Sequence, residues 1–267
     1  MTRSVLGIDA AWTAKNPSGV AAIADQGTGW RLIAAAASYQ AFNIACGRSD
    51  HDPDTADALL ESSTQIVGAR PDLVAVDMPL ARGPITGRRV SDNLISSAFG
   101  GHGASTHSPN MERPGAVGAA FSRGFSEAGY DLAVAQPDGP AMIEVYPHPA
   151  LIALTGAARR LPYKMARIRK YWPELNPAER RVRLVAEWAD IIKHLETEIG
   201  GLALLNPPPP DARGVTLKAF EDTLDAVICC WIGACVLDKR AHAYGDGFSA
   251  VWVPMPIRND KVAKSCG

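Results

Sequence analysis

The sequence predicts an α/β fold in which helices flank a mixed central sheet. Three apolar runs, residues 4–9, 19–25 and 29–37, are joined by short connections, which is typical of an antiparallel meander. A later run, residues 72–77, is apolar almost throughout, as expected for a parallel strand that is covered on both faces. With a helix between them, these runs give the order strand-strand-strand-helix-strand, which indicates an α/β domain.

The first helix is predicted to begin at Asp52-Pro53, where an N-cap residue precedes a first-turn proline, and to extend to about Gly68. Residues 142–146 return to strand character. A short helix follows at residues 147–155, because proline is favoured in the first turn of a helix.

The C-terminal third is predicted to be mainly helical. Asn176 and Pro177, with Glu179 two residues further on, give an N-cap, a first-turn proline and a capping-box acid. Residues 216–238 form a helix that is apolar nearly all round, so it should be buried in the core. Residues 250–253 are predicted to be a last short strand.

These elements fit a single domain over residues 1–257, followed by a loose polar tail at residues 258–267. Residues 79–140 are rich in Gly, Pro, Ser and Arg and lack hydrophobic periodicity, which predicts a loop-rich insertion. Residues 156–210 are expected to form a helical insertion that ends in an extended proline run.

Composition excludes several classes of protein. The chain has 27 Lys and Arg against 28 Asp and Glu, so its formal charge of −1 rules out a uniformly basic coat but not a local basic patch. No apolar run reaches the ~20 residues that span a bilayer. Five cysteines without a Cys-x-x-Cys pair argue against a zinc ribbon. Reduced thiols and the lack of a secretory h-region predict a cytoplasmic protein.

Acidic residues occupy core-forming segments. Asp9 and Asp77 each end an apolar strand, and Glu144 lies within another. Asp222 and Asp225 are three residues apart on the apolar helix, so they share one face. Each acid alone also fits a turn cap or a partner for arginine. Because burying carboxylates is costly without a partner, the set predicts a divalent cation held by oxygen ligands.

Short motifs connect the chain to a known family. Residues 5–9 (Val-Leu-Gly-Ile-Asp), followed by Gly19-Val20, resemble the opening of ribonuclease H-like domains. Further motifs are similar to those of the DUF429 family of predicted ribonuclease H-like nucleases: residues 76–79 (Val-Asp-Met-Pro), 144–149 (Glu-Val-Tyr-Pro-His-Pro) and 221–226 (Glu-Asp-Thr-Leu-Asp-Ala). The helical Asp-x-x-Asp-Ala motif also resembles the C-terminal helix of RuvC-type resolvases. The resemblance covers nearly the whole chain.

The resemblance implies a ribonuclease H-like fold, nuclease activity and a set of site residues. The implied metal ligands and catalytic acids are Asp9, Asp77, Asp222 and Asp225, to which the family's own motif adds Glu144. The implied phosphate-binding residues are Arg88, Arg89 and Lys164, with Asp92 as an accessory residue. His148, which follows the Glu144 strand, is the best candidate for an accessory histidine. Asp77 departs from the superfamily, where glutamate is usual, and its shorter side chain would place an ion differently.

The mechanism expected of such a site is phosphodiester hydrolysis with two Mg²⁺ or Mn²⁺ ions ~3.5–4 Å apart. Asp9 would bridge both ions, and Asp77 and Asp225 would each complete one coordination shell. Asp222 or Glu144 would orient the water or lie in the outer shell.

Residues 159–170 carry six Lys or Arg residues and no acid, with Tyr163 among them and Tyr171 and Trp172 following. This mixture suits phosphate contacts with base stacking, and it equally fits a solvated helix face. The expected partner is a nucleic acid or nucleotide, without a membrane. A homodimer would enlarge the basic surface.

Two other functions remain open. The first is a nucleotide- or sugar-phosphate-binding enzyme related to the actin and sugar-kinase fold, which normally has two domains with glycine-rich phosphate loops. Residues 10–13 (Ala-Ala-Trp-Thr) lack the expected glycine, and the chain has room for one domain. The second is a non-catalytic interaction protein on the same fold.

Overall fold

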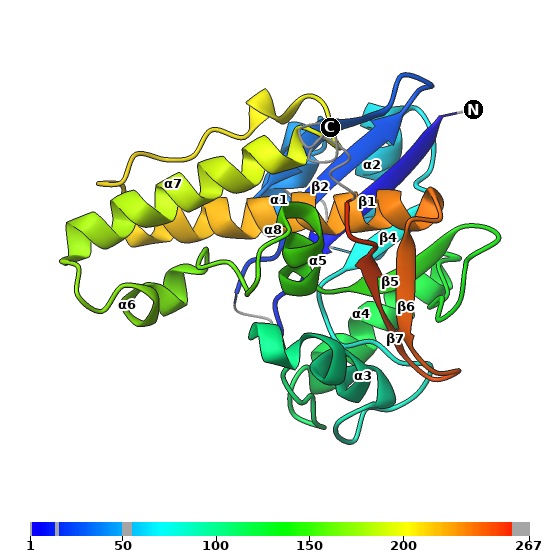
Figure 1. The fold of residues 1–267 in the computed structure, drawn as a ribbon. Coiled ribbons are helices and arrows are strands. Elements are labelled where there is room, and N and C mark those ends of the chain that lie inside the picture. The colour runs from blue at the N-terminus through cyan, green and yellow to red at the C-terminus, as the bar shows by residue number, and fades with distance from the viewer. Residues whose placement is uncertain (1, 14–15, 50–54, 258–267) are drawn as a thin grey trace, which may run out of the picture.

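A seven-stranded mixed sheet forms the centre of the computed structural model, which describes residues 2–13, 16–49 and 55–257. Its strand order is β3-β2-β1-β4-β5-β7-β6 (Figure 1). The predicted meander is confirmed, since β2 pairs antiparallel with both β1 and β3. β1, β4, β5 and β7 run parallel. The strands are β1 (Arg3–Asp9), β2 (Gly19–Asp25), β3 (Trp30–Ala36), β4 (Leu73–Val76), β5 (Ala141–Val145), β6 (Ala241–Gly245) and β7 (Ala250–Pro254).

Helices cover both faces of the sheet, as the predicted α/β fold requires. On one face lie α5 (Pro147–Thr155), α7 (Pro177–Leu195) and α8 (Gly214–Leu237), whose apolar side chains share a core with the strands. The opposite face is covered by α1 (Tyr39–Ala45), α2 (Ala56–Val67) and α4 (Gly115–Glu127). α3 (Val90–Phe99) packs on β6 and β7. Shorter helices are η1 (Gly100–His102), η2 (Met165–Arg167), α6 (Ile168–Tyr171) and η3 (Leu202–Leu204).

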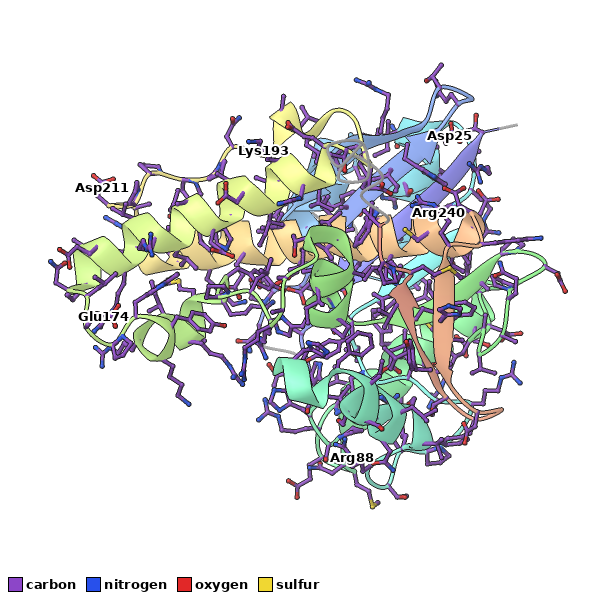
Figure 2. The ribbon with its side chains drawn as sticks, in the orientation of Figure 1. Asp25, Arg88, Glu174, Lys193, Asp211 and Arg240 are labelled. Carbon is purple, nitrogen blue, oxygen red and sulfur yellow. The ribbon has the colours of Figure 1, made fainter. Side chains whose placement is uncertain are left out.

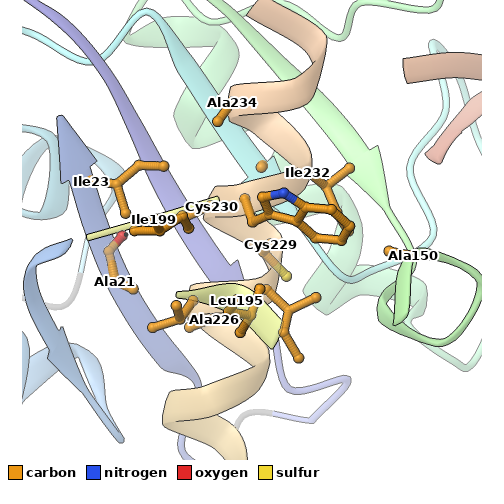
Figure 3. Close-up of a cluster of buried hydrophobic side chains, with 14 of the residues drawn as sticks. Ala21, Ile23, Ala150, Leu195, Ile199, Ala226, Cys229, Cys230, Ile232 and Ala234 are labelled. Carbon is orange, nitrogen blue, oxygen red and sulfur yellow. Dashed lines mark hydrogen bonds between the residues drawn. The ribbon is translucent and has the colours of Figure 1, made fainter. Parts of the chain in front are cut away.

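The central helix α8 lies unusually close to β1 and β2. A Cβ atom on Gly7 would lie 2.3 Å from the Ala226 carbonyl oxygen, and one on Gly19 would lie 2.0 Å from that of Asp222. Figure 3 shows Cys230 of α8 near Ile23, in the core that the sequence predicts for this helix. These two glycines therefore bring the acidic end of α8 directly beside the first two strands.

The predicted loop-rich segment at residues 79–140 differs most from the structure, because it contains α3 and α4. Both helices are rich in Ser, Gly or Ala and present weak apolar stripes, which explains why periodicity misses them. β6 was not predicted either, since Ala-His-Ala-Tyr-Gly lacks a clear apolar alternation. The prediction for Asp52-Pro53 lies outside the described residues, as does the tail at 258–267. Thr55 caps α2, and Gly68 ends it as predicted.

The described cysteines, Cys46, Cys229, Cys230 and Cys235, are free and buried, as expected for small core residues. Among the described helices, none combines the length and the apolar character needed to cross a membrane.

Candidate active site

Two carboxylates meet at the edge of the sheet where β1 and β4 end. Asp9 is the last residue of β1, and Asp77 directly follows β4. The register pairs Ile8 with Val76, and the Asp77 amide donates to the Ile8 carbonyl at 2.9 Å. Both aspartates line a cavity of about 890 Å³. The carboxyl ends of adjacent parallel strands are the usual place for a binding site in an α/β protein.

The third element of the site is α8, which contributes Glu221, Asp222 and Asp225, all less than a tenth exposed. The close approach at Gly19 brings the Asp222 backbone against β2, and an Asp222–Asp9 hydrogen bond joins the helix to the end of β1. Asp9, Asp77 and Asp222 thus line one cavity, and Asp225 is near enough for its charge to act on Asp9.

The acids of α8 already have cationic partners. Asp225 accepts hydrogen bonds from the Tyr163 hydroxyl at 2.8 Å and from the Lys164 ammonium group. Lys218 donates to Asp222 and, at 2.8 Å, to Glu221. Lys164 was expected to bind substrate phosphate, but here its ammonium group is bonded to Asp225 and stands over the Tyr163 ring. Much of the negative charge of α8 is therefore neutralised within the protein.

Asp9 and Asp77 lack such a partner among the described residues. No hydrogen bond or ion pair joins the Asp77 carboxylate to another described side chain, and Asp9 contacts only the acid Asp222 in this way. Burial raises the pKa of Asp77 to about 7, with Lys164 opposing the shift and Asp225 adding to it. Burial also raises the pKa of Asp9 well above its usual value, and Asp225 raises it further. Strongly perturbed carboxyl groups in a cavity are candidates for function.

Glu144 is part of a buried ion cluster with Arg89 and Asp92. The Arg89 guanidinium donates to Glu144 at 2.5 and 2.7 Å and to Asp92 at 2.8 and 3.0 Å. Its remaining N–H bonds to the Leu80 carbonyl at 2.7 Å, and Glu144 accepts from the Leu80 amide at 2.7 Å. Every N–H of the guanidinium is used within the protein, so Arg89, which also lines the cavity, has none left for the predicted phosphate contact in this arrangement. The cluster fixes the backbone three residues beyond Asp77, and Glu144 is a structural partner rather than a free catalytic carboxylate.

Arg88 also differs from its predicted role. The side chain is exposed and donates to Asn93 at 2.7 Å, to Ser108 at 3.0 Å and to Ser96 at 2.5 Å. Figure 2 shows it at the outer edge of the α3 region. Arg88 is absent from the described lining of the cavity, and its contacts tie the loop at Ser108 to α3.

His148, the predicted accessory histidine, lines the cavity and is 5% exposed. Its ring makes edge contacts with Tyr146 and Tyr163, at centroid distances of 5.3 and 5.4 Å. Burial lowers the pKa of His148 well below its usual value, and Arg160 and Lys164 lower it further. The imidazole is therefore neutral at pH 7.

Comparison with known proteins identifies the family. A family model described as "Protein of unknown function (DUF429)" matches residues 7–247. The chain belongs to the DUF429 family. Searches of curated proteins and of solved structures give no significant match. The predicted resemblance to DUF429 is confirmed, and all the aspartates of the site lie within the matched residues.

Several residues of this DUF429 site were not assigned from the sequence. Lys218 and Glu221 belong to its charge network, and their spacing to Asp222 on one helix was the signal that could have identified them. Arg160 and Arg167 line the cavity, and the sequence marks them only as members of a basic segment. Tyr163 holds Asp225, a contact over 62 positions that no local pattern predicts.

Proposed function

We propose that this DUF429 protein is a metal-dependent phosphodiester hydrolase that acts on nucleic acid. One observation carries the proposal: Asp9 and Asp77, two acids without a cationic partner among the described residues, face a cavity that also has cationic walls. Arg160 and Arg167 line the same cavity. Phosphoryl chemistry uses carboxylates that bind a cation, with guanidinium groups beside them that bind the phosphate.

The ribonuclease H-like fold is part of the same proposal. Its support is the antiparallel meander β1-β2-β3 followed by the parallel strands β4 and β5, with an acid at the end of β1 and another after β4. The acidic end of α8 beside them agrees with the Asp-x-x-Asp motif that suggested the resemblance.

The donor set fits Mg²⁺ or Mn²⁺. The described residues contain no preassembled group of three or more His, Cys, Asp or Glu side chains around one point. Mg²⁺ commonly takes one or two carboxylates and completes its shell with water and substrate phosphate oxygens. Asp9 and Asp77 meet that requirement. A second ion, as the resemblance implies, would require Asp222 or Asp225 to separate from its lysine.

When bound, the cation would neutralise charge on the phosphate and supply an activated water. The protein's own groups position the substrate. Arg160 and Arg167 bind phosphate oxygens from the cavity wall, where a guanidinium fork matches their geometry. The Glu144–Arg89 ion pair holds Leu80, and thereby the segment after Asp77, in a fixed place. Lys164 holds Asp225 and stabilises the charge cluster behind the two site acids.

Cleavage assays test this proposal. Single-stranded, duplex and junction DNA, RNA and an RNA–DNA hybrid are incubated with Mg²⁺, Mn²⁺ or EDTA. We expect metal-dependent cleavage by the wild type and its loss in Asp9→Asn and Asp77→Asn. Asp190→Asn, an exposed change on α7, is the matched control. Cleavage by Asp9→Asn at the wild-type rate, or no cleavage of any substrate by the wild type, would refute the proposal.

A small phosphorylated substrate is the second candidate. The cavity of about 890 Å³ falls within the range of small-molecule sites, and its cations lie inside it rather than on a flat face. Mn²⁺ binding that depends on Asp9, without cleavage of any polymer, would favour this candidate.

A further inference from the structure

This inference rests on the proposed function, which does not specify whether the nucleic acid is single-stranded or double-stranded. The distribution of positive charge favours one of these two forms. We infer that the substrate is a single strand, bound along residues 159–183 and led by them into the cavity. We call this segment the basic arm. It includes η2, α6 and the first two turns of α7.

The basic arm concentrates positive charge. Its 25 residues carry nine Lys or Arg and two acids, Glu174 and Glu179, although the whole chain has a formal charge of −1. The rest of the protein is therefore net negative. Because phosphate attraction depends on local potential, a polyanion would be drawn to this segment and repelled elsewhere.

The cations of the arm continue from the cavity to its outer end. Arg160, Lys164 and Arg167 line the cavity, and Arg169 and Lys170 are exposed on α6 immediately afterwards. Figure 1 shows α6 and the beginning of α7 projecting beyond the sheet. Figure 2 places Glu174 at the far end of this projection. A strand whose phosphate lies near Asp9 and Asp77 can thus follow the arm outward.

The arm is a held structure rather than a loose basic tail. Arg180 of α7 donates to the backbone carbonyls of Trp172 and Pro173, both at 2.7 Å, and so fastens the end of α6. Trp172 packs against the main core, and the Trp188 indole donates to the Tyr163 carbonyl at 2.9 Å. Such a scaffold presents its cations at fixed positions, which lowers the entropy lost when a strand binds.

The recessed position of the acids favours a single strand over a duplex. Asp9 and Asp77 are partly buried, and Asp225 behind them is fully buried. Bending a duplex of 20–30 base pairs by 40–90° costs about 1–6 kcal/mol, whereas a flexible single strand can bring one phosphate into the cavity without that cost. Trp12 also lines the cavity and offers an aromatic face for a base.

Binding measurements test this inference separately from catalysis. Fluorescence anisotropy with Ca²⁺ in place of Mg²⁺ gives the Kd of labelled 20-nucleotide single strands of DNA and RNA and of a duplex of equal length. The arm variant is Arg169→Glu with Lys170→Glu. The control is Lys193→Glu with Lys239→Glu, which makes the same charge change at exposed positions outside the arm. Figure 2 shows Lys193 away from α6.

We expect the arm variant to bind the single strands about tenfold more weakly than the wild type. The slope of log affinity against log salt concentration should become shallower by about 1.4, because two phosphate contacts are lost. The control should stay within about twofold of the wild type. Equal affinity of the arm variant and the control, or duplex binding at least as tight as single-strand binding, would overturn the inference. Hydrolysis of bis(p-nitrophenyl) phosphate by the wild type with Mn²⁺ tests the proposed phosphodiesterase activity alone. Failure of the single-strand inference can therefore be distinguished from failure of the proposed function.

Discussion

Replacing Arg89 by methionine should unfold the protein under much milder conditions. The side chain is 3% exposed and donates to two buried carboxylates, Asp92 and Glu144, whose side chains are 1% and 6% exposed. Without it, the hydrogen-bond donors left among the described residues are the Leu80 amide for Glu144 and the amide of residue 89 for Asp92. Removing one partner of a buried ion pair costs about 3–5 kcal/mol, because the remaining charge is left uncompensated.

Chemical and thermal unfolding measure this loss. For a chain of this length, about 3–5 kcal/mol corresponds to a fall in Tm of roughly 10 °C. Arg88→Met is the matched control. The Arg88 guanidinium is next to Arg89 in the sequence but is exposed, so it should contribute less than about 1 kcal/mol to the free energy of unfolding. Adding Glu144→Gln to Arg89→Met should restore part of the stability, because one unpaired charge is removed. Wild-type stability of Arg89→Met together with weaker substrate binding would refute the ion-cluster role and restore the phosphate-binding role that the sequence predicted.

Three further changes have defined outcomes. Burial lowers the pKa of His148, so the folded protein disfavours its protonated form. The free energy of unfolding should therefore fall by about 1.4 kcal/mol per pH unit as the pH drops below 6.5. Urea titrations of His148→Gln should lack this part of the pH dependence. Gly19→Ala should lower Tm strongly, since its Cβ would lie 2.0 Å from the Asp222 carbonyl oxygen, whereas Gly139→Ala, where nothing lies within 4 Å, should not. Mn²⁺ at 100 times its Kd should stabilise the wild type by about 2.7 kcal/mol and Asp9→Asn by much less.

Six of the seven strands could be predicted from the sequence because they are short apolar runs with clear boundaries, whereas β6 is not such a run. The aspartates could be placed for the same reason, since Asp9 and Asp77 interrupt apolar runs where strands end. Helices α3 and α4 could not, because Ser, Gly and Ala residues carry little periodic signal.

The roles of charged residues were harder to predict than their positions. Arg89 meets Glu144 across 55 positions, and Lys164 meets Asp225 across 61. A single sequence shows that an arginine is near a predicted site but not whether its N–H groups point to a substrate or to a buried acid. Local pairs such as Lys218 and Asp222 are the exception, because helical spacing fixes their distance.

The acids of the site differ in whether a cation pairs with them, and their substitutions should therefore change stability in opposite directions. Glu144, Asp222 and Asp225 each pair with a cation, so their neutralisation should destabilise the fold by leaving that cation unmatched. Asp9 and Asp77 have raised pKa values because burial and neighbouring acids disfavour their charge. Asp77→Asn should therefore stabilise the metal-free protein at pH 8, by about 1–2 kcal/mol, while it abolishes metal-dependent cleavage.

Urea unfolding in EDTA measures this effect, with Asp225→Asn as the contrasting variant. Residues that weaken a fold and are required for activity are the expected mark of a functional site, because the same repulsion that costs stability is relieved when a cation binds. If Asp77→Asn instead destabilised the metal-free protein as much as Asp225→Asn, Asp77 would have a structural partner, and the site would have to be placed elsewhere.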